Sequence, residues 1–469
     1  AEDGIRDTSR GLVGSEMCIR DREYRENSIF SANDIVRAQA LSASEAPDQE
    51  ADTIGETSIF DFYAEMEFPL TDWATVNGSA RYTDEENFGN ETTYSIKAEV
   101  VPTDSLRLRG TFGTTFRAPN LREQFLAGQA GVIAGNLDPC VVPTTANDGG
   151  VYDPNGDARA QIVLDNCVLD GTDPTALGLQ ANVLIPTETG GSTDIKAETS
   201  ESFTLGFVYT QDFTQAFDLD FSLTYFSIDV EDTVEELDST EVLNRCYNDD
   251  PNLANALCSR IARRGVNPEN NTVSRVDSSF VNLGLVTSKG YDINARYIDD
   301  FSIGDNFIEM AWTVTGTHYD ELKEQIDPQS PVDDRVGEAG FPEWAWVVRG
   351  GFQLDNWGLT YRARFVGEFA RDPEDIQDST NAENRTACNA LGGPDNCIRV
   401  HSGDSVWYHD LSLTYEADEW TVTGGIRNLL DQEPPLIDQG SGPARMNMVV
   451  QSTYDLFGRR WFLNASKRF

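Results

Sequence analysis

The chain has 469 residues, of which 39% are hydrophobic and 10% aromatic, and it carries a formal net charge of −44. This excess of carboxylates excludes nucleic acid as a partner, because no stripe of lysine and arginine could offset the repulsion from phosphates. No run of about eighteen apolar residues occurs, which excludes a transmembrane helix but leaves a membrane β-barrel open, since barrel strands need an apolar residue only at every second position. The acidity itself fits either solubility in salty water or a vestibule that attracts cations.

The N-terminal segment stands apart from the rest. The stretch "DGIRDTSRGLVGSEMCIRDR" has neither the apolar core of a signal peptide nor the period of a strand. It looks like translated sequencing-adapter read-through. We therefore interpret residues 1–22 as a non-native segment and assign residues 23–469 to the folded domain.

Beyond this segment the hydrophobic period is two almost everywhere, which predicts β-strands. In "IFDFYAEMEFPL" the residues Phe60, Phe62 and Met66 alternate with charged residues, and in "FDLDFSLTYFSIDV" the phase slips at Phe226. The slip predicts either a bulge or the end of the buried band. About thirteen strands are expected, at 57–70, 71–84, 91–101, 105–117, 196–212, 216–231, 272–299, 303–319, 343–355, 357–370, 405–416, 419–429 and 453–469.

Long strands with one apolar and one charged face are typical of a transmembrane barrel wall. Short turns alternate with long loops, and the long loops are 118–195, 232–271, 320–342 and 371–404. This sorting is typical of an outer-membrane barrel with tight periplasmic turns and long external loops. We expect these residues to face outward: Phe60, Phe62, Met66, Leu106, Leu108, Phe112, Phe221, Leu223, Trp346, Phe365 and Leu413. We expect these residues to face the concave side: Arg107, Arg109, Asp218, Asp220 and Arg362.

Six of the seven cysteines fall in the long loops as three local sets, and Cys18 stands alone. An even number in polar, turn-rich loops favours disulfides in an oxidising compartment. Zinc is the alternative, but no Cys-x-x-Cys occurs and only three histidines are present. The expected pairs are Cys140 with Cys167, Cys246 with Cys258, and Cys388 with Cys397.

Other candidate sites are weaker. The stretch "YDPNGDARA" (152–160) has the alternating carboxylates of a calcium loop, but its glycine is misplaced and Leu164 stands where a bidentate glutamate belongs. A Ser-His-Asp hydrolase site from His401, Ser402, Asp404, His409 and Asp410 has no nucleophile elbow to support it. We expect no enzyme, no metal site and no cofactor. Four arginines could line a substrate path or pair with carboxylates of neighbouring strands or of a plug: Arg107, Arg109, Arg362 and Arg364.

Three segments resemble the TonB-dependent outer-membrane receptors. The stretch "FRAPNLREQF" (116–125) resembles a family signature, and "NLLDQEPP" (428–435) with "YDLFGRRWFLNASKRF" (454–469) resembles the closing segment. Residues 246–297 resemble a cysteine-stapled loop and the strand after it. The signature residues are Phe116, Arg117, Ala118, Pro119, Asn120 and Leu121, and Phe469 resembles the terminal aromatic read by the barrel-assembly machinery.

The resemblance implies an all-β, antiparallel, up-and-down transmembrane barrel of which this chain holds about thirteen of twenty-two strands. The N-terminal plug, which contacts TonB, would be missing. An open, strongly curved sheet or a forced closure is then expected, because residues 57–70 and 453–469 would not be neighbours.

The function implied is uptake of a scarce nutrient across the outer membrane of a Gram-negative bacterium: a siderophore, haem, vitamin or oligosaccharide. The implied partners are outer-membrane lipid, the TonB energy-transducing complex through the missing plug, a small-molecule ligand and the barrel-assembly machinery. The alternatives are a passive porin, an outer-membrane hydrolase and a soluble carbohydrate-binding sandwich.

Overall fold

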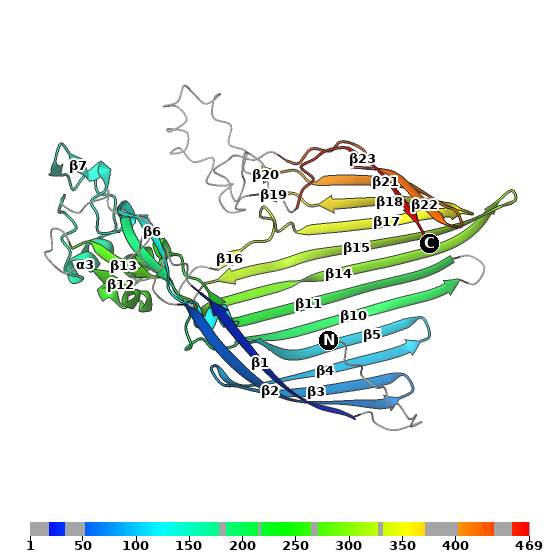
Figure 1. Ribbon diagram of the computed structural model, residues 1–469, viewed down its shortest axis with the longest axis horizontal. Helices are drawn as coiled ribbons and strands as arrows, with labels where there is room; N and C mark the ends of the chain where they lie inside the picture. The colour runs from blue at the N-terminus through cyan, green and yellow to red at the C-terminus, as the bar shows by residue number, and fades with distance from the viewer. Residues whose placement is uncertain are drawn as a thin grey trace.

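The computed structural model describes residues 18–32, 52–177, 184–213, 217–263, 271–326, 332–370, 402–435 and 453–468. Most of them belong to one large antiparallel sheet in which each strand pairs with the next one along the wall (Figure 1). Fourteen strands form the main path in this order: β1 (Cys18–Ser31), β2 (Thr53–Thr71), β3 (Ala74–Glu85), β4 (Gly89–Thr103), β5 (Leu106–Arg117), β10 (Glu198–Phe213), β11 (Phe217–Glu235), β14 (Val281–Ile303), β15 (Asn306–Gln325), β17 (Trp344–Leu354), β18 (Trp357–Val366), β21 (Val406–Glu416), β22 (Trp420–Arg427) and β23 (Arg460–Lys467).

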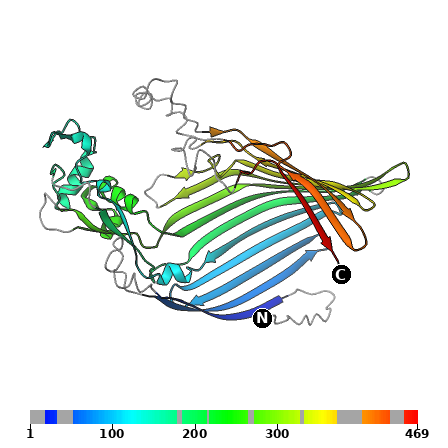
Figure 2. The ribbon, with the colours of Figure 1, turned by 45° about the horizontal axis from the view of Figure 1, so that its top comes forward.

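The sheet is strongly curved and open (Figure 2). The strands β1 and β23 form its two edges, and no described residue of one pairs with the other. All thirteen predicted wall strands are present, so the predicted antiparallel architecture is confirmed. The short strand β16 (Asp333–Asp334) pairs with the end of β15.

The strand β1 begins within the segment that the sequence analysis set aside. Residues Cys18 to Arg22 pair in regular register with Met66 to Phe62 of β2. Residues 18–22 are therefore part of the sheet, and the interpretation of residues 1–22 as non-native stays a prediction. The sequence did not predict a strand there, because ladder hydrogen bonds join backbone groups, and nearly all described side chains of β1 are exposed, so its sequence carries little burial signal.

The strand register puts the predicted outward and concave sets on opposite faces of the sheet. Directly opposed residues of paired strands share a face. One row crosses eight strands as Leu108, Phe207, Leu223, Ile293, Gly316, Trp346, Phe365 and Trp407. A row on the other face contains Asp220, Arg296, Thr313, Arg349, Arg362 and Asp410. We call these the apolar face and the charged face.

Aromatic rings on the apolar face form two groups, one near each end of the strands. Near the short turns, Trp357 lies 4.7 Å from Tyr415, and Phe217 lies 5.1 Å from Tyr297, between ring centroids. Near the long loops a row of rings includes Phe203, Tyr225, Tyr291, His318, Trp344 and Trp346. Two aromatic girdles around an apolar band are typical of a membrane-spanning barrel wall. Among the described residues, no helix is long and apolar enough to cross a membrane.

Two of the long loops fold together into one unit at the left end of the sheet in Figure 1. We call this unit the cap and define it as the described part of residues 118–197 and 236–280. Its four-stranded sheet has the order β12 (Ile261–Arg263), β13 (Val273–Asp277), β9 (Leu184–Thr189), β6 (Gln129–Ala134). The predicted strand 272–299 is thus divided between β13 in the cap and β14 in the wall. The other cap elements are α2 (Leu121–Phe125), α3 (Gln161–Leu169), α4 (Ser239–Asn248), β7 (Asn147–Asp148), β8 (Val151–Tyr152) and four short 3-10 helices.

The cap has its own hydrophobic core. Val242, Leu243 and Tyr247 of α4 are almost completely buried there beside Ile185 of β9 and Val276 of β13. The core therefore joins residues from both of the long loops that make up the cap. Two further short strands, β19 (Phe369–Ala370) and β20 (Ser402–Gly403), pair with each other beside the wall.

Candidate functional site

The signature segment forms the corner where the wall meets the cap. The strand β5 ends at Arg117, because Pro119 cannot donate a ladder hydrogen bond. The side chain of Asn120 then accepts hydrogen bonds from the amides of Arg122 and Glu123, while the Glu123 carboxylate accepts one from the amide of Asn120. This reciprocal capping box starts α2.

Arg117 ties this corner to the next wall strand. Its Nε and Nη2 each donate a hydrogen bond of 2.6 Å to Glu198 at the start of β10, and its Nη1 lies 3.1 Å from both oxygens of Glu123. The hydrogen bonds to Glu198 raise the pKa of Arg117. Burial works to raise the pKa of Glu198, but the bonds from Arg117 and from the amide of Val234 outweigh it and lower that pKa. Arg117 thus acts as an anchor between β5, β10 and α2.

Four arginines predicted to line the charged face all have partners. Arg107 lies 3.5 Å from Glu99 and Arg362 lies 3.9 Å from Asp410, each on a neighbouring strand. Arg109 donates to the hydroxyl of Thr224 at 3.1 Å. Arg364 donates to the carbonyl of Thr453 at 2.6 Å, and its guanidinium lies over the Tyr408 ring. Arg107 and Arg362 thus pair with carboxylates of neighbouring strands, whereas Arg109 and Arg364 contact a hydroxyl and a backbone carbonyl, and a substrate path along these residues stays a prediction.

The face of the wall changes polarity at the phase slip in β11. No bulge occurs at Phe226, and the register shift lies between Glu231 and Thr233 instead. Because β11 continues in regular register, its even-numbered residues share the charged face. Ser222 and Thr224 lie on this face nearer the short turns, and Phe226, Ile228 and Val230 lie on it nearer the cap. On the apolar face the same stretch turns polar. The slip therefore marks the end of the apolar band, the second of the two predicted explanations.

Several apolar residues gather on the charged face near the cap. Ile228 lies beside Ser288 and Leu322, and Val230 lies beside Val286, in the strand register. The ring centroids of Phe226 and Tyr319 lie 6.1 Å apart in an edge-on arrangement. We call this the mouth patch, and its residues are Phe226, Ile228, Val230, Val286, Tyr319 and Leu322.

Charged groups border the mouth patch. Glu324 shares a register row with Val286 and is paired with Arg335 at 3.0 Å. Glu235, at the end of β11, is half-buried, and no hydrogen bond or ion pair joins it to another described side chain. Burial raises the pKa of Glu235, and the nearby carboxylates of Glu324 and Glu198 raise it further.

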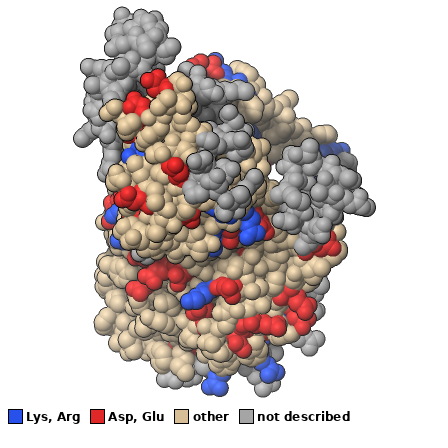
Figure 3. Space-filling view, turned by 90° about the vertical axis from the view of Figure 1, so that its left-hand side faces the viewer, with Lys and Arg blue, Asp and Glu red and all other residues tan. Residues whose placement is uncertain are grey.

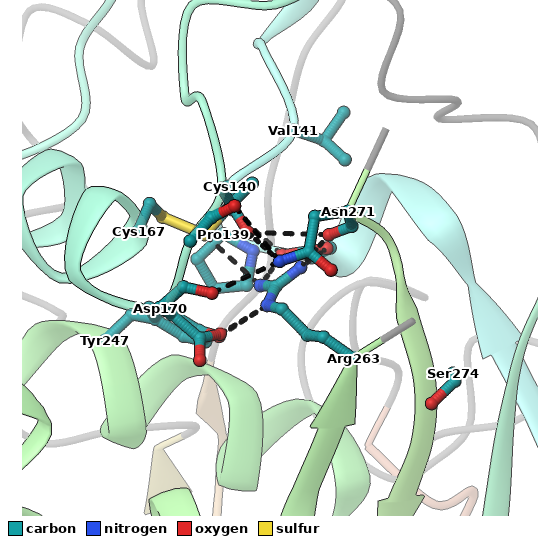
Figure 4. A network of polar contacts seen from close by, with 12 residues as sticks. Pro139, Cys140, Val141, Cys167, Asp170, Tyr247, Arg263, Asn271 and Ser274 are labelled. Carbon is teal, nitrogen blue, oxygen red and sulfur yellow. Dashed lines mark hydrogen bonds and ion pairs between the residues drawn. A yellow bond between two sulfur atoms is a disulfide. The ribbon is translucent and has the colours of Figure 1, made fainter. Parts of the chain in front are cut away.

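A buried arginine holds the two loops of the cap together (Figure 4). Arg263 donates two hydrogen bonds of 2.8 Å to Asp138 and further ones to Asp170 and to the carbonyl of Asn271. Its Nε also donates to the hydroxyl of Tyr247 at 2.9 Å. Burial raises the pKa of Tyr247. No short sequence motif predicts this network, because its members come from distant parts of the chain.

Two of the three expected disulfides lie in the cap. Cys140 is bonded to Cys167 with Cα atoms 5.6 Å apart, and Cys246 to Cys258 with Cα atoms 4.8 Å apart. The expected pair of Cys388 and Cys397 lies outside the described residues, as does Phe469. The side chain of Cys18 is also outside them.

The weaker candidate sites have structural explanations. In the calcium-like stretch, Asp153 accepts a hydrogen bond from the amide of Asn155, and Asp157 is paired with Arg159 at 2.6 Å. Within the described part of the chain, no group of three or more metal-ligating side chains is present. His409 shares a hydrogen bond of 2.6 Å with Tyr361, and His401 lies outside the described residues.

Comparison with known proteins agrees with the barrel architecture. The model of the family "TonB dependent receptor-like, beta-barrel" matches residues 14–429. The ferric enterobactin receptor of Pseudomonas aeruginosa, in a mutant form, is similar at a TM-score of 0.58 and 14% identity, over 97% of this chain and 51% of the receptor. The siderophore receptor PirA of Acinetobacter baumannii is similar at a TM-score of 0.53 and 15% identity, over 98% of this chain and 56% of PirA. No curated protein gives a significant sequence match.

The fold and the sorted loops define an outer-membrane type of antiparallel barrel wall. The chain belongs to the family of TonB-dependent receptor β-barrels. It spans about half the length of the solved receptors that it matches. Members of this family are outer-membrane transporters of Gram-negative bacteria and not enzymes, which agrees with the prediction of no catalytic role.

Proposed function

We propose that this chain forms the wall and the external cap of a TonB-dependent receptor that takes up a scarce nutrient across the outer membrane. The observation that carries the proposal is the family match over residues 14–429. The position of the cap supports it, because the cap lies at the end of the sheet where the long loops gather (Figure 1). The cap would capture the ligand, and the charged face would line the lumen, with Arg107, Arg109, Arg362 and Arg364 among its residues.

The proposed function also implies three partners: the TonB complex, the barrel-assembly machinery and outer-membrane lipid. Coupling to the TonB complex would require an N-terminal plug in addition to the barrel. Phe469 would serve as the signal to the barrel-assembly machinery, and outer-membrane lipid would cover the apolar face. Residues 1–22 would then be non-native, and residues 23–469 the C-terminal portion of the barrel.

Uptake by the full-length parent gene tests the function. The gene would be expressed in a Gram-negative host lacking its own receptors, with and without TonB. The probes would be a radiolabelled ferric siderophore, haem, cobalamin and maltoheptaose. We expect one probe to accumulate only when TonB is present. Accumulation without TonB would identify a passive porin instead, and energy-dependent uptake by residues 23–469 alone would show that the chain needs no plug.

A further inference from the structure

The mouth patch is an anomaly on the charged face. Below it, the same face carries hydroxyl and charged side chains such as Thr224, Asp220 and Arg296. Ile228 nonetheless has 37% of its surface exposed among the other apolar residues of the patch. Apolar side chains gathered on an otherwise polar, water-facing surface commonly mark a place where a ligand or partner binds.

The charge around the patch is strongly negative. The described part of the cap contains sixteen carboxylates and seven basic side chains. Figure 3 faces this end of the molecule and shows Asp and Glu outnumbering Lys and Arg. Five of the seven basic residues are already paired with carboxylates within the cap: Arg159, Arg245, Arg260, Arg263 and Arg275. The cap therefore has few positive charges available to attract an anion.

Glu235 is a carboxylate near the patch, since it interacts electrostatically with Glu324, and it has no hydrogen-bond or ion-pair partner among the described side chains. It lies on β11 five positions after Val230, and its electrostatic neighbours include Glu324, Glu198 and Glu123. Two nearby cations among the described residues already have carboxylate partners: Arg117 is bonded to Glu198 and Glu123, and Arg335 to Glu324. A ligand cation placed here would relieve the repulsion between these carboxylates.

We propose that the mouth patch and Glu235 together bind an amphiphilic cation, with its aromatic or aliphatic body on Phe226, Ile228 and Tyr319. The rings of Phe226 and Tyr319 also favour a cation over an anion, because their faces are negative. This inference rests on the proposed receptor function and specifies the class of ligand. It predicts that the receptor disfavours a polyanionic ligand of the same size.

Binding of two probes with the same shape and opposite charge tests the inference. Tetraphenylphosphonium is the cation and tetraphenylborate the anion. The full chain would be placed in zwitterionic detergent micelles, and equilibrium dialysis would measure binding of each probe relative to empty micelles. We expect the cation to bind about tenfold or more tightly than the anion, which corresponds to about 1.4 kcal/mol or more.

Five variants separate the apolar contribution to binding from that of the charge. Phe226→Ser should lower the affinity for both probes. If this variant loses the circular dichroism signal of β-sheet, Ile228→Ser replaces it. Glu235→Gln should lower the affinity for the cation by about fivefold and leave the affinity for the anion unchanged. Tyr225→Ser and Glu231→Gln, which change neighbouring residues of β11 on the opposite face, should leave both affinities unchanged.

Several results would overturn the inference. Tighter binding of the anion than of the cation would do so. Losses of affinity in Tyr225→Ser and Glu231→Gln as large as those in Phe226→Ser and Glu235→Gln would also do so. Absence of binding above empty micelles would also overturn it. TonB-dependent uptake of a polyanion by the full-length protein would refute the inference while leaving the proposed function intact.

Discussion

The ring of Phe125 lies against the backbone of Gly55, so closely that a Cβ added to Gly55 would lie 2.1 Å from the ring Cγ. Phe125 ends α2 and is the last residue of the signature stretch 116–125, whereas Gly55 lies in β2. The strands β3 and β4 separate β2 from β5 in the sheet. The hydroxyl of Thr53 also accepts a hydrogen bond from the amide of Ala127 at 3.1 Å. The end of the signature stretch and the residues just after it thus link β5 to β2, two wall strands that are not neighbours.

Gly55→Val should displace α2 from β2. The added side chain cannot fit against the Phe125 ring, and overpacking of this kind typically costs about 1–3 kcal/mol. Proteolysis of residues 121–127 in detergent-solubilised protein would report the displacement as faster cleavage. The double variant Gly55→Val with Phe125→Ala should recover part of the protection of the single variant. Unchanged cleavage in Gly55→Val would contradict this account of the contact.

Arg117→Lys should weaken the corner although it keeps the charge. A lysine cannot reproduce the paired hydrogen bonds to Glu198, and because Arg117 is half-exposed, we expect a loss of about 1 kcal/mol in unfolding free energy. Urea unfolding of the wild type, Arg117→Lys, Glu198→Gln and the double variant would measure the coupling. Purely additive losses would show that the two side chains do not act together.

Removal of the disulfides should affect the cap before the wall. The pair Cys140–Cys167 closes a longer loop than Cys246–Cys258, with sequence separations of 27 and 12. Longer loops lose more chain entropy on closure, so we expect stabilisation of about 3 kcal/mol, slightly larger for the first pair. Peptide mapping without reduction should recover both pairs together with Cys388–Cys397. Crossed pairs would contradict the assignment.

The ion pair of Asp157 and Arg159 should make the cap sensitive to acid. The hydrogen bonds from Arg159 lower the pKa of Asp157 to about 2. Because the pKa in the folded state is lower than that in the unfolded state, which is near 3.9, the stabilisation is complete above about pH 4 and disappears as the pH falls towards 2. The free energy of cap unfolding, measured by protease protection, should fall over this range in the wild type. Asp157→Asn should be less stable at pH 7 and lack this contribution to the pH dependence.

Cysteines on adjacent residues of β11 should report opposite environments. Phe221→Cys lies on the apolar face and Asp220→Cys on the charged face. In lipid vesicles, a fluorophore at position 221 should be quenched by a lipid-soluble nitroxide, and one at position 220 by aqueous iodide. The reverse pattern would point to a soluble closed core rather than a membrane wall.

Period-two alternation was sufficient to predict the wall. Phe221 and Leu223 alternate with Asp220 and Ser222 because each face of a membrane strand meets a different solvent. The same reasoning could not reveal the cap, whose stability depends on contacts such as Arg263 with Asp138, 125 residues apart. Local cysteine spacing predicted the staples, but it contains no information on how two loops pack together. The contact of Phe125 with Gly55 is equally invisible to a local pattern.

The change of polarity at Phe226 also shows how far the wall extends beyond the apolar band. From Phe226 to Glu235 the strand β11 continues for ten residues beyond the apolar band. At about 3.4 Å per residue and a tilt of about 40°, this stretch rises about 25 Å. The upper part of the wall therefore extends beyond the apolar band, and the cap lies at its outer end. A bulky molecule approaching from outside would meet the cap well before it reached the headgroups.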